Sequence, residues 1–219
     1  MTGPEAQDTL RRALMKLAED GVLAQDRPNP KIEAIRDKLF RIDWPRRVTP
    51  VSTAAIGEMF TRTKGIRLLP NRCIELEPRT EGGVAILTQL LIDAAFNEAA
   101  LEVEIIEIGV VSFFLYEDEL KSVSMRFEPP EGKGGGKHDF YHAQFTSSIR
   151  RRHPVPGCAH WLPDSELAFP IDADNGMELF IAAIVHVGSA TIIPKLARDV
   201  PGVRDVASGM KLDIGLTRP

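Results

Sequence analysis

Histidine and cysteine side chains gather between residues 138 and 160, where His138, His142, His153, Cys158 and His160 all lie. Imidazole and thiolate groups are the ligands that Zn²⁺ prefers in proteins. One hypothesis is therefore a zinc site held by His138, His142 and His160. The spacing matches no familiar zinc module, and two strand residues four apart are separated by about 13 Å. The alternative is that these histidines are structural and that no cofactor is bound.

The same stretch offers a nucleophile. Cys158 follows His153 by five residues, and a thiolate stabilised by a nearby imidazolium attacks electrophilic carbon well. These residues define an enzyme hypothesis in which Cys158 attacks and His142 or His153 moves the proton. No motif elsewhere in the chain has the spacing of a known catalytic or cofactor signature.

One family resemblance rests on these residues. The expected order is a helix, a three-stranded meander, a proline-rich segment with His153-Pro154 and Cys158, then Trp161 and two closing helices. This order is similar to that of ubiquitin-conjugating enzymes over roughly the last 135 residues. The resemblance implies a transferase with a cysteine nucleophile. The chain departs from the family at Val155, which stands where the His-Pro-Asn tripeptide of that family has asparagine.

Two further segments could contact anions. The loop 132–137 is rich in glycine and lysine, but a strand residue follows it and the P-loop spacing is absent. A flexible hairpin tip is the preferred interpretation. Arg150, Arg151 and Arg152 form a basic cluster, which we predict as a contact for nucleic acid or another anion.

The elements that must position these residues form an antiparallel meander. Residues 120–127 alternate between apolar and polar side chains, which predicts a half-buried strand. Residues 101–116 predict a longer strand with a bulge at Ile105-Ile106 or a break near Gly109. A hairpin loop is expected at 117–119, and the next strand at 138–145. The face of that strand with Tyr141 and Phe145 brings more apolar area, so we expect it to be buried and His142 to be partly solvent-accessible.

Helices are expected before and after the meander. Helical spacing of apolar residues from residue 5 onward predicts a first helix that ends at or before Gly21 and a second over 31–42, and Ser52 is a good N-cap for a third. The run 84–100 is apolar nearly all round and predicts a buried helix. Asn175 and Glu178 have the spacing of a capping box for a later helix, and residues 189–200 predict another. The tail from Pro201 has too few apolar residues to predict a structure.

Together these elements predict an α+β fold, with an antiparallel meander of about four to five strands packed with helices. We divide the chain into a helical N-terminal arm, residues 1–65, and an α+β core domain, residues 66–219. No apolar run approaches the length of a membrane span. Only two cysteines occur in the 219 residues, and this usage is typical of a soluble cytoplasmic protein.

Charge is unevenly distributed along the chain. Residues 27–79 carry twelve Lys and Arg against six Asp and Glu, a net charge of +6 in a chain of net charge −4. This asymmetry suits a subunit that binds a protein partner or itself, or a basic half that contacts nucleic acid. The hypothesis that we prefer is a non-catalytic interaction or assembly protein of a bacterial type, with the His/Cys enzyme as the alternative.

Overall fold

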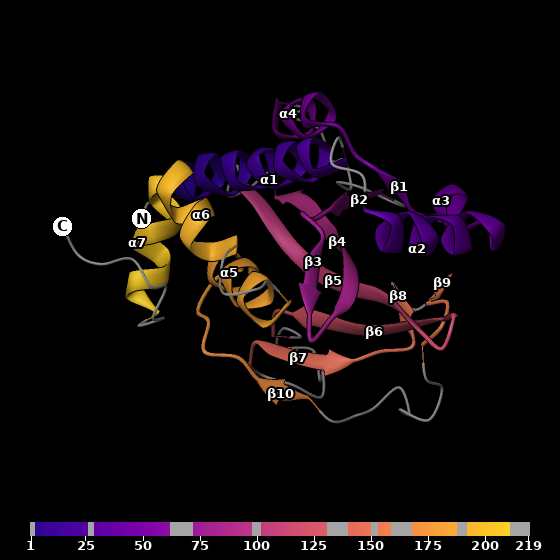
Figure 1. The fold of residues 1–219 in the computed structure, drawn as a ribbon. Helices are drawn as coiled ribbons and strands as arrows, with labels where there is room; N and C mark the ends of the chain where they lie inside the picture. Colours follow the sequence, from indigo (N-terminus) through magenta and orange to yellow (C-terminus); the bar gives the residue numbers. More distant parts are fainter. Residues whose placement is uncertain are drawn as a thin grey trace.

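The structure is a computed structural model that describes residues 3–25, 29–61, 72–97, 102–130, 140–149, 153–158, 168–187 and 192–210. Within these ranges, one sheet has helices on both faces (Figure 1). Two hydrophobic clusters lie on opposite faces of the sheet. The predicted α+β class with an antiparallel sheet packed with helices is therefore confirmed.

Three long strands form the centre of the sheet. They are β4 (Val84–Asn97), β5 (Glu102–Tyr116) and β6 (Glu119–Glu128), and each pairs antiparallel with the next. The helix predicted over 84–100 is wrong, because this segment is strand β4. Leu87 and Leu91 of β4 pack into one cluster, whereas Leu90 and Ile92 pack into the other. A strand buried on both faces shows no polar alternation, so its sequence resembles a buried helix.

The predicted bulge in β5 is confirmed. Ala94 of β4 pairs with Ile105, whereas Asp93 pairs with Glu107, so Ile106 is the extra residue. The strand continues without a break through Gly109. The hairpin between β5 and β6 is tighter than predicted, because Tyr116 pairs with Glu119 and only two residues form the loop. Both loop residues have positive φ, 50° and 60°, as in a type I′ turn.

Shorter strands extend the sheet on both sides to eight strands, more than the four to five predicted. The order along the sheet is β1-β2-β4-β5-β6-β7-β10, and β3 also pairs with β4. Because β1 is parallel to β2, the sheet is mixed. The short strands are β1 (Thr49–Pro50), β2 (Arg72–Glu75), β3 (Arg79–Glu81), β7 (His142–Phe145) and β10 (Phe169–Pro170). A separate pair consists of β8 (Ser148–Ile149) and β9 (His153–Pro154).

The first face of the sheet packs against five helices: α1 (Gly3–Gln25), α4 (Thr53–Thr61), α5 (Gly176–Val187), α6 (Ile192–Asp199) and α7 (Pro201–Gly209). The predicted capping box of α5 is confirmed. The Asn175 side chain accepts hydrogen bonds from the backbone of Met177 and Glu178, at 3.0 Å each. Glu178 in turn accepts one from the backbone N–H of Asp174 at 2.7 Å. Helix α7 was not predicted from the sequence.

The second face packs against α2 (Pro30–Arg41) and α3 (Trp44–Arg47). Trp44 is buried, donates a 2.9 Å hydrogen bond from Nε1 to the side chain of Gln89, and meets the ring of Phe113 edge-on. The helices of the predicted N-terminal arm therefore contribute to both faces of the sheet, α1 to the first and α2 to the second. The proposed boundary between residues 65 and 66 stays a prediction. Within the described part of the chain, no helix is long and apolar enough to cross a membrane.

Candidate functional site

His142 is buried on strand β7, with 1% of its surface exposed. The burial expected for the opposite side holds for Ala143, which lies in the first cluster, but Tyr141 and Phe145, on which the prediction rested, are only half-buried. The expected accessibility of His142 is wrong, because both faces of the sheet are covered at this position. Its Nδ1 lies 3.1 Å from the carbonyl oxygen of Phe140, and its Nε2 lies 3.4 Å from a carboxylate oxygen of Glu128. Both ring nitrogens therefore face hydrogen-bond acceptors.

A row of ionisable side chains crosses the second face of the sheet beside His142. Asp93 of β4 pairs with Glu107 of β5, and Glu128 of β6 pairs with His142 of β7. Ile108 of β5 pairs with Phe127 of β6, so the next position along these two strands brings Glu107 beside Glu128. Gln144 donates a 2.7 Å hydrogen bond to Glu128. We call these five residues the polar row. Buried charged groups are costly unless they are paired and hydrogen-bonded, so the polar row constrains how β4 to β7 pack.

Two atoms in and beside the polar row are buried without a hydrogen-bond partner, Oδ1 of Asp93 and Nε of Arg126. The guanidinium of Arg126 reaches Glu128 at 3.6 Å through Nη1. Among the described residues, no group of three or more His, Cys, Asp or Glu side chains could hold a metal ion.

Cys158 is also buried and lies at another place on the same face. Its Sγ is 3.6 Å from the backbone carbonyl of Thr146 and 4.0 Å from the hydroxyl of Ser124. Thr146 follows His142 by four residues along the same chain segment, which corresponds to about 13 Å in extended backbone. The structure therefore does not bring Cys158 and His142 together as nucleophile and base.

Several predicted site residues lie outside the described residues. These are His138, His160, Arg150, Arg151, Arg152 and the glycine loop 132–137. The backbone of His153, in strand β9, pairs with that of Ile149 in strand β8. The zinc site of His138, His142 and His160 and the anion contact of the arginine cluster therefore stay predictions.

A cavity of about 710 Å³ lies on the first face of the sheet, among the N-terminal parts of α1 and α5, the end of α7 and the start of β5. We call it the acidic pocket. Four carboxylates line it, those of Glu104, Asp174, Glu178 and Asp205, and its described lining includes no Lys, Arg or His. Apolar side chains line it as well: Leu10, Ile105, Met177, Val206, Pro129 and Pro130.

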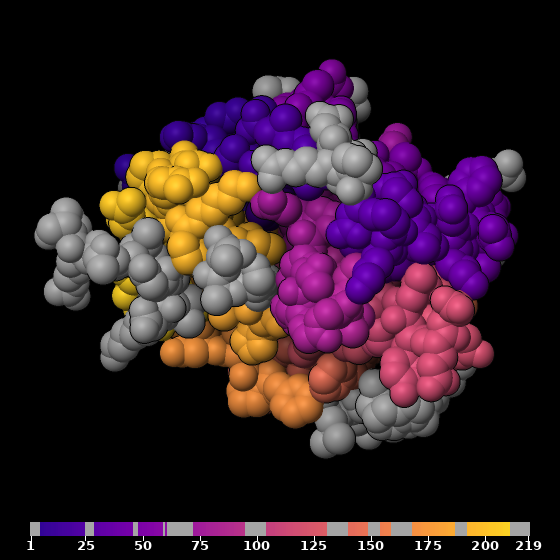
Figure 2. Space-filling model, in the orientation of Figure 1, coloured from indigo at the N-terminus to yellow at the C-terminus, as the bar shows by residue number. Residues whose placement is uncertain are grey.

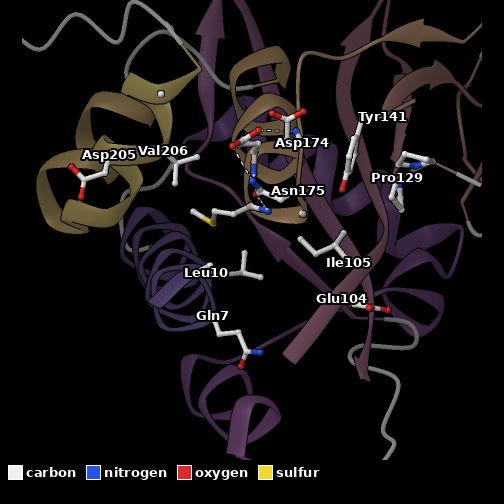
Figure 3. A pocket seen from close by; sticks show the side chains of 16 residues that line it. Gln7, Leu10, Glu104, Ile105, Pro129, Tyr141, Asp174, Asn175, Asp205 and Val206 are labelled. Atoms are coloured by element: carbon white, nitrogen blue, oxygen red, sulfur yellow. Dashed lines mark hydrogen bonds between the residues drawn. The ribbon is translucent and has the colours of Figure 1, made fainter. Parts of the chain in front are cut away.

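The arrangement in the acidic pocket separates apolar from charged groups. In Figure 3, Ile105 and Val206 point into the space, and the carboxylates of Glu104, Asp174 and Asp205 lie around its edge. Tyr141 stands on the side opposite α7. Burial, together with the nearby Glu178 and Asp174, raises the pKa of the Tyr141 phenol, so it stays protonated. No described residue forms an ion pair with Asp174 or Asp205.

The sequence did not predict this pocket. Its lining comes from segments as far apart as Ala6 and Gly209, and only the capping box of α5 was recognisable in advance. The resemblance to ubiquitin-conjugating enzymes also weakens, because the helix that opens the expected order is strand β4. No protein-family model, curated protein or solved structure matches this chain.

Proposed function

We propose that this chain is a non-catalytic interaction protein, and that the acidic pocket binds a partner segment carrying both basic and apolar side chains. The observation that carries the proposal is the composition of the pocket, with an apolar interior, the carboxylates of Glu104, Asp174 and Asp205 at its edge and no cation in its described lining. Binding sites typically combine apolar walls with a few polar groups that fix orientation.

The two kinds of lining have different physical effects. Carboxylates that share a rim attract a positively charged partner and raise its rate of association. Apolar side chains of the partner supply affinity, because their burial against the apolar part of the lining removes apolar surface from water. A partner with a basic residue beside an apolar one satisfies both parts of the pocket.

The chemistry of the lining is limited to a few kinds of group. The described lining includes no Ser, Thr, Cys, His or Lys side chain, so its acid–base groups are carboxylates and the phenol of Tyr141. Glu178 is engaged in capping α5. His142 and Cys158, the residues of the enzyme hypothesis, do not line the pocket.

The nucleic-acid hypothesis has less support in the described residues. Arg36 pairs with Glu33 and Glu75, and Arg79 pairs with Glu81, so part of the positive charge of residues 27–79 is neutralised internally. Both cysteines are buried free thiols, which is typical of proteins in a reducing compartment. A cytoplasmic location is therefore part of the proposal.

Fluorescence polarisation with a labelled peptide of alternating lysine and leucine tests the proposal. We expect the full chain to bind this peptide, and a matched glutamate-leucine peptide to stay free. The variant Asp174→Asn/Asp205→Asn should bind at least about tenfold more weakly. Asp118→Asn, which removes an exposed carboxylate in the turn between β5 and β6, is the matched control and should bind like wild type. Equal affinity of wild type and the double variant would refute the pocket as the site.

A further inference from the structure

The C-terminal end of α2 exposes apolar side chains to solvent. Phe40 is 75% exposed and Ile42 is 43% exposed, although the inner stripe of the same helix, Ile32, Ile35 and Leu39, is buried. Exposed Arg41 lies between the two apolar residues. We call Phe40, Arg41 and Ile42 the α2 knob. Clustered exposed apolar groups on a folded protein mark sites of association.

The charge of the α2 knob is opposite to that of the acidic pocket. Its one ionisable residue is Arg41, which is exposed between the two apolar side chains. The pocket lining contributes four carboxylates and, in its described part, no cation. The knob therefore offers the combination of basic and apolar side chains that the pocket accepts.

The knob and the pocket lie at opposite ends of the molecule. In Figure 1, α2 and α3 are at one end, whereas α7 and the N-terminal end of α1, which line the pocket, are at the other. Figure 2 shows the α2–α3 segment as the right-hand edge of the surface. The two surfaces of one molecule cannot meet, but those of two molecules can.

We propose that the α2 knob of one copy docks into the acidic pocket of the next copy. This inference rests on the proposed function and names its partner as a second copy of this chain. Phe40 enters among Leu10, Ile105 and Val206, where its ring leaves water, and Arg41 reaches the rim carboxylates near Asp174. A contact between two different patches is heterologous, so it produces a ring or an open chain of copies rather than a symmetric dimer.

Sedimentation velocity of the full chain over a wide range of concentration tests the inference. We expect the mean sedimentation coefficient to rise with concentration for wild type. Phe40→Ser, Arg41→Glu and Asp174→Lys should each shift this rise to concentrations at least about tenfold higher. The double variant Arg41→Glu/Asp174→Lys should recover part of the lost association, because it restores opposite charges across the contact. Val22→Ser, at another exposed apolar residue, is the matched control and should behave as wild type.

Three outcomes would overturn the inference. The first is a wild-type chain that stays monomeric at every concentration. The second is association that is weakened by Phe40→Ser but not by Asp174→Lys. The third is association that is weakened by Asp174→Lys but not by Phe40→Ser. If the chain is monomeric and still binds the lysine-leucine peptide, the pocket takes a different partner and the proposed function stands. If it neither associates nor binds the peptide, both proposals fail. All three sites are exposed, so thermal melts of the variants should match that of wild type.

Discussion

The two ring nitrogens of His142 show how the hydrogen bonding of the polar row depends on single atoms. A carbonyl oxygen only accepts hydrogen bonds, so the contact between Nδ1 and the Phe140 carbonyl places a proton on Nδ1. The Nε2 atom then faces a Glu128 oxygen that also accepts a hydrogen bond from Gln144. The two contacts hold the buried imidazole between Phe140 and Glu128, so the packing of β6 against β7 depends on this one ring.

Replacing His142 should therefore be costly. We expect His142→Ala to lower the free energy of unfolding by about 1–3 kcal/mol, because it leaves a largely buried Glu128 with one partner fewer. The comparison is His186→Ala, which removes an exposed histidine at the end of α5 that contacts the Phe127 ring and the Ala182 carbonyl, and it should cost less, about 1 kcal/mol. Urea unfolding of the two variants measures the difference. Equal losses would show that the contact with Glu128 contributes nothing to stability.

The thiol of Cys73 gives a pH-dependent prediction. Burial, with a smaller effect of nearby Glu75, raises its pKa far above the ordinary value of 9.0. The thiol is then neutral in the folded chain but ionises in the unfolded chain above pH 9.0. Folding therefore becomes less favourable as the pH rises past this value, by at most about 1.4 kcal/mol per pH unit.

Other groups also titrate in this range, so the comparison is with Cys73→Ala. We expect the difference in unfolding free energy between wild type and Cys73→Ala to be constant below pH 9.0 and to shrink above it. Chemical unfolding at a series of pH values checks this result. Parallel curves for the two proteins over the whole range would contradict it.

At the scale of elements, α1 lies so close to β2 that one position admits only glycine. A Cβ atom at Gly21 would overlap the backbone carbonyl oxygen of Glu75, and the backbone cannot move away without separating the helix from the sheet. By contrast, a Cβ atom at Gly57 in α4 meets no atom within 4 Å. The two helical glycines thus occupy opposite environments.

Alanine substitutions at these glycines should have opposite effects. We expect Gly21→Ala to destabilise the fold by about 1–3 kcal/mol, although alanine favours a helix more than glycine does. Gly57→Ala should stabilise it by about 0.4–1 kcal/mol, because alanine has less freedom to lose on folding. Thermal and urea melts measure both changes. A stabilised Gly21→Ala variant would mean that the α1–β2 spacing adjusts easily.

Local patterns predicted the elements whose signal lies within a few residues. The strand β6, the bulge at Ile106 and the capping box of Asn175 with Glu178 each depend on neighbours in the sequence, and the structure has all three. The half-buried pattern predicted for β6 is wrong at its centre, where Ser122 and Ser124 are buried and Val123 is 45% exposed. Helix α1 continues to Gln25, past Gly21, where the sequence predicted its end. The strand β4 was mistaken for a helix because its period is hidden when both faces are buried. Helix α7 has only Val203 and Ala207 as buried residues, too few to show a period.

The candidate sites depend on contacts that no local pattern encodes. The partners of His142 are Glu128 on β6 and Phe140, which precedes β7, and the contact with Glu128 follows from the register of the two strands. The acidic pocket unites segments from both ends of the chain. Histidine and cysteine are recognisable individually, so the sequence predicted a catalytic or metal site near residues 138–160. Scattered carboxylates become a site only through the fold.

At the scale of the whole molecule, the N-terminal helices cover both faces of the sheet. Helix α1 buries Leu10, Leu14 and Leu17 in the first cluster. The segment with α2 and α3 buries Ile32, Ile35, Leu39 and Trp44 in the second. Each large apolar side chain that leaves water stabilises the fold by about 1.5–3 kcal/mol.

The burial of these side chains predicts the effect of removing residues 1–65. Seven such side chains contribute about 10–21 kcal/mol, comparable to or larger than the net stability of a typical domain, about 5–15 kcal/mol, so we expect residues 66–219 alone to lack a cooperative unfolding transition. Near-ultraviolet circular dichroism and thermal melts of the fragment check this result. Co-expression of residues 1–65 as a separate chain should restore the transition, because the same side chains can then cover the sheet. A fragment 66–219 that melts cooperatively by itself would instead establish residues 1–65 as the separate arm that the sequence predicts.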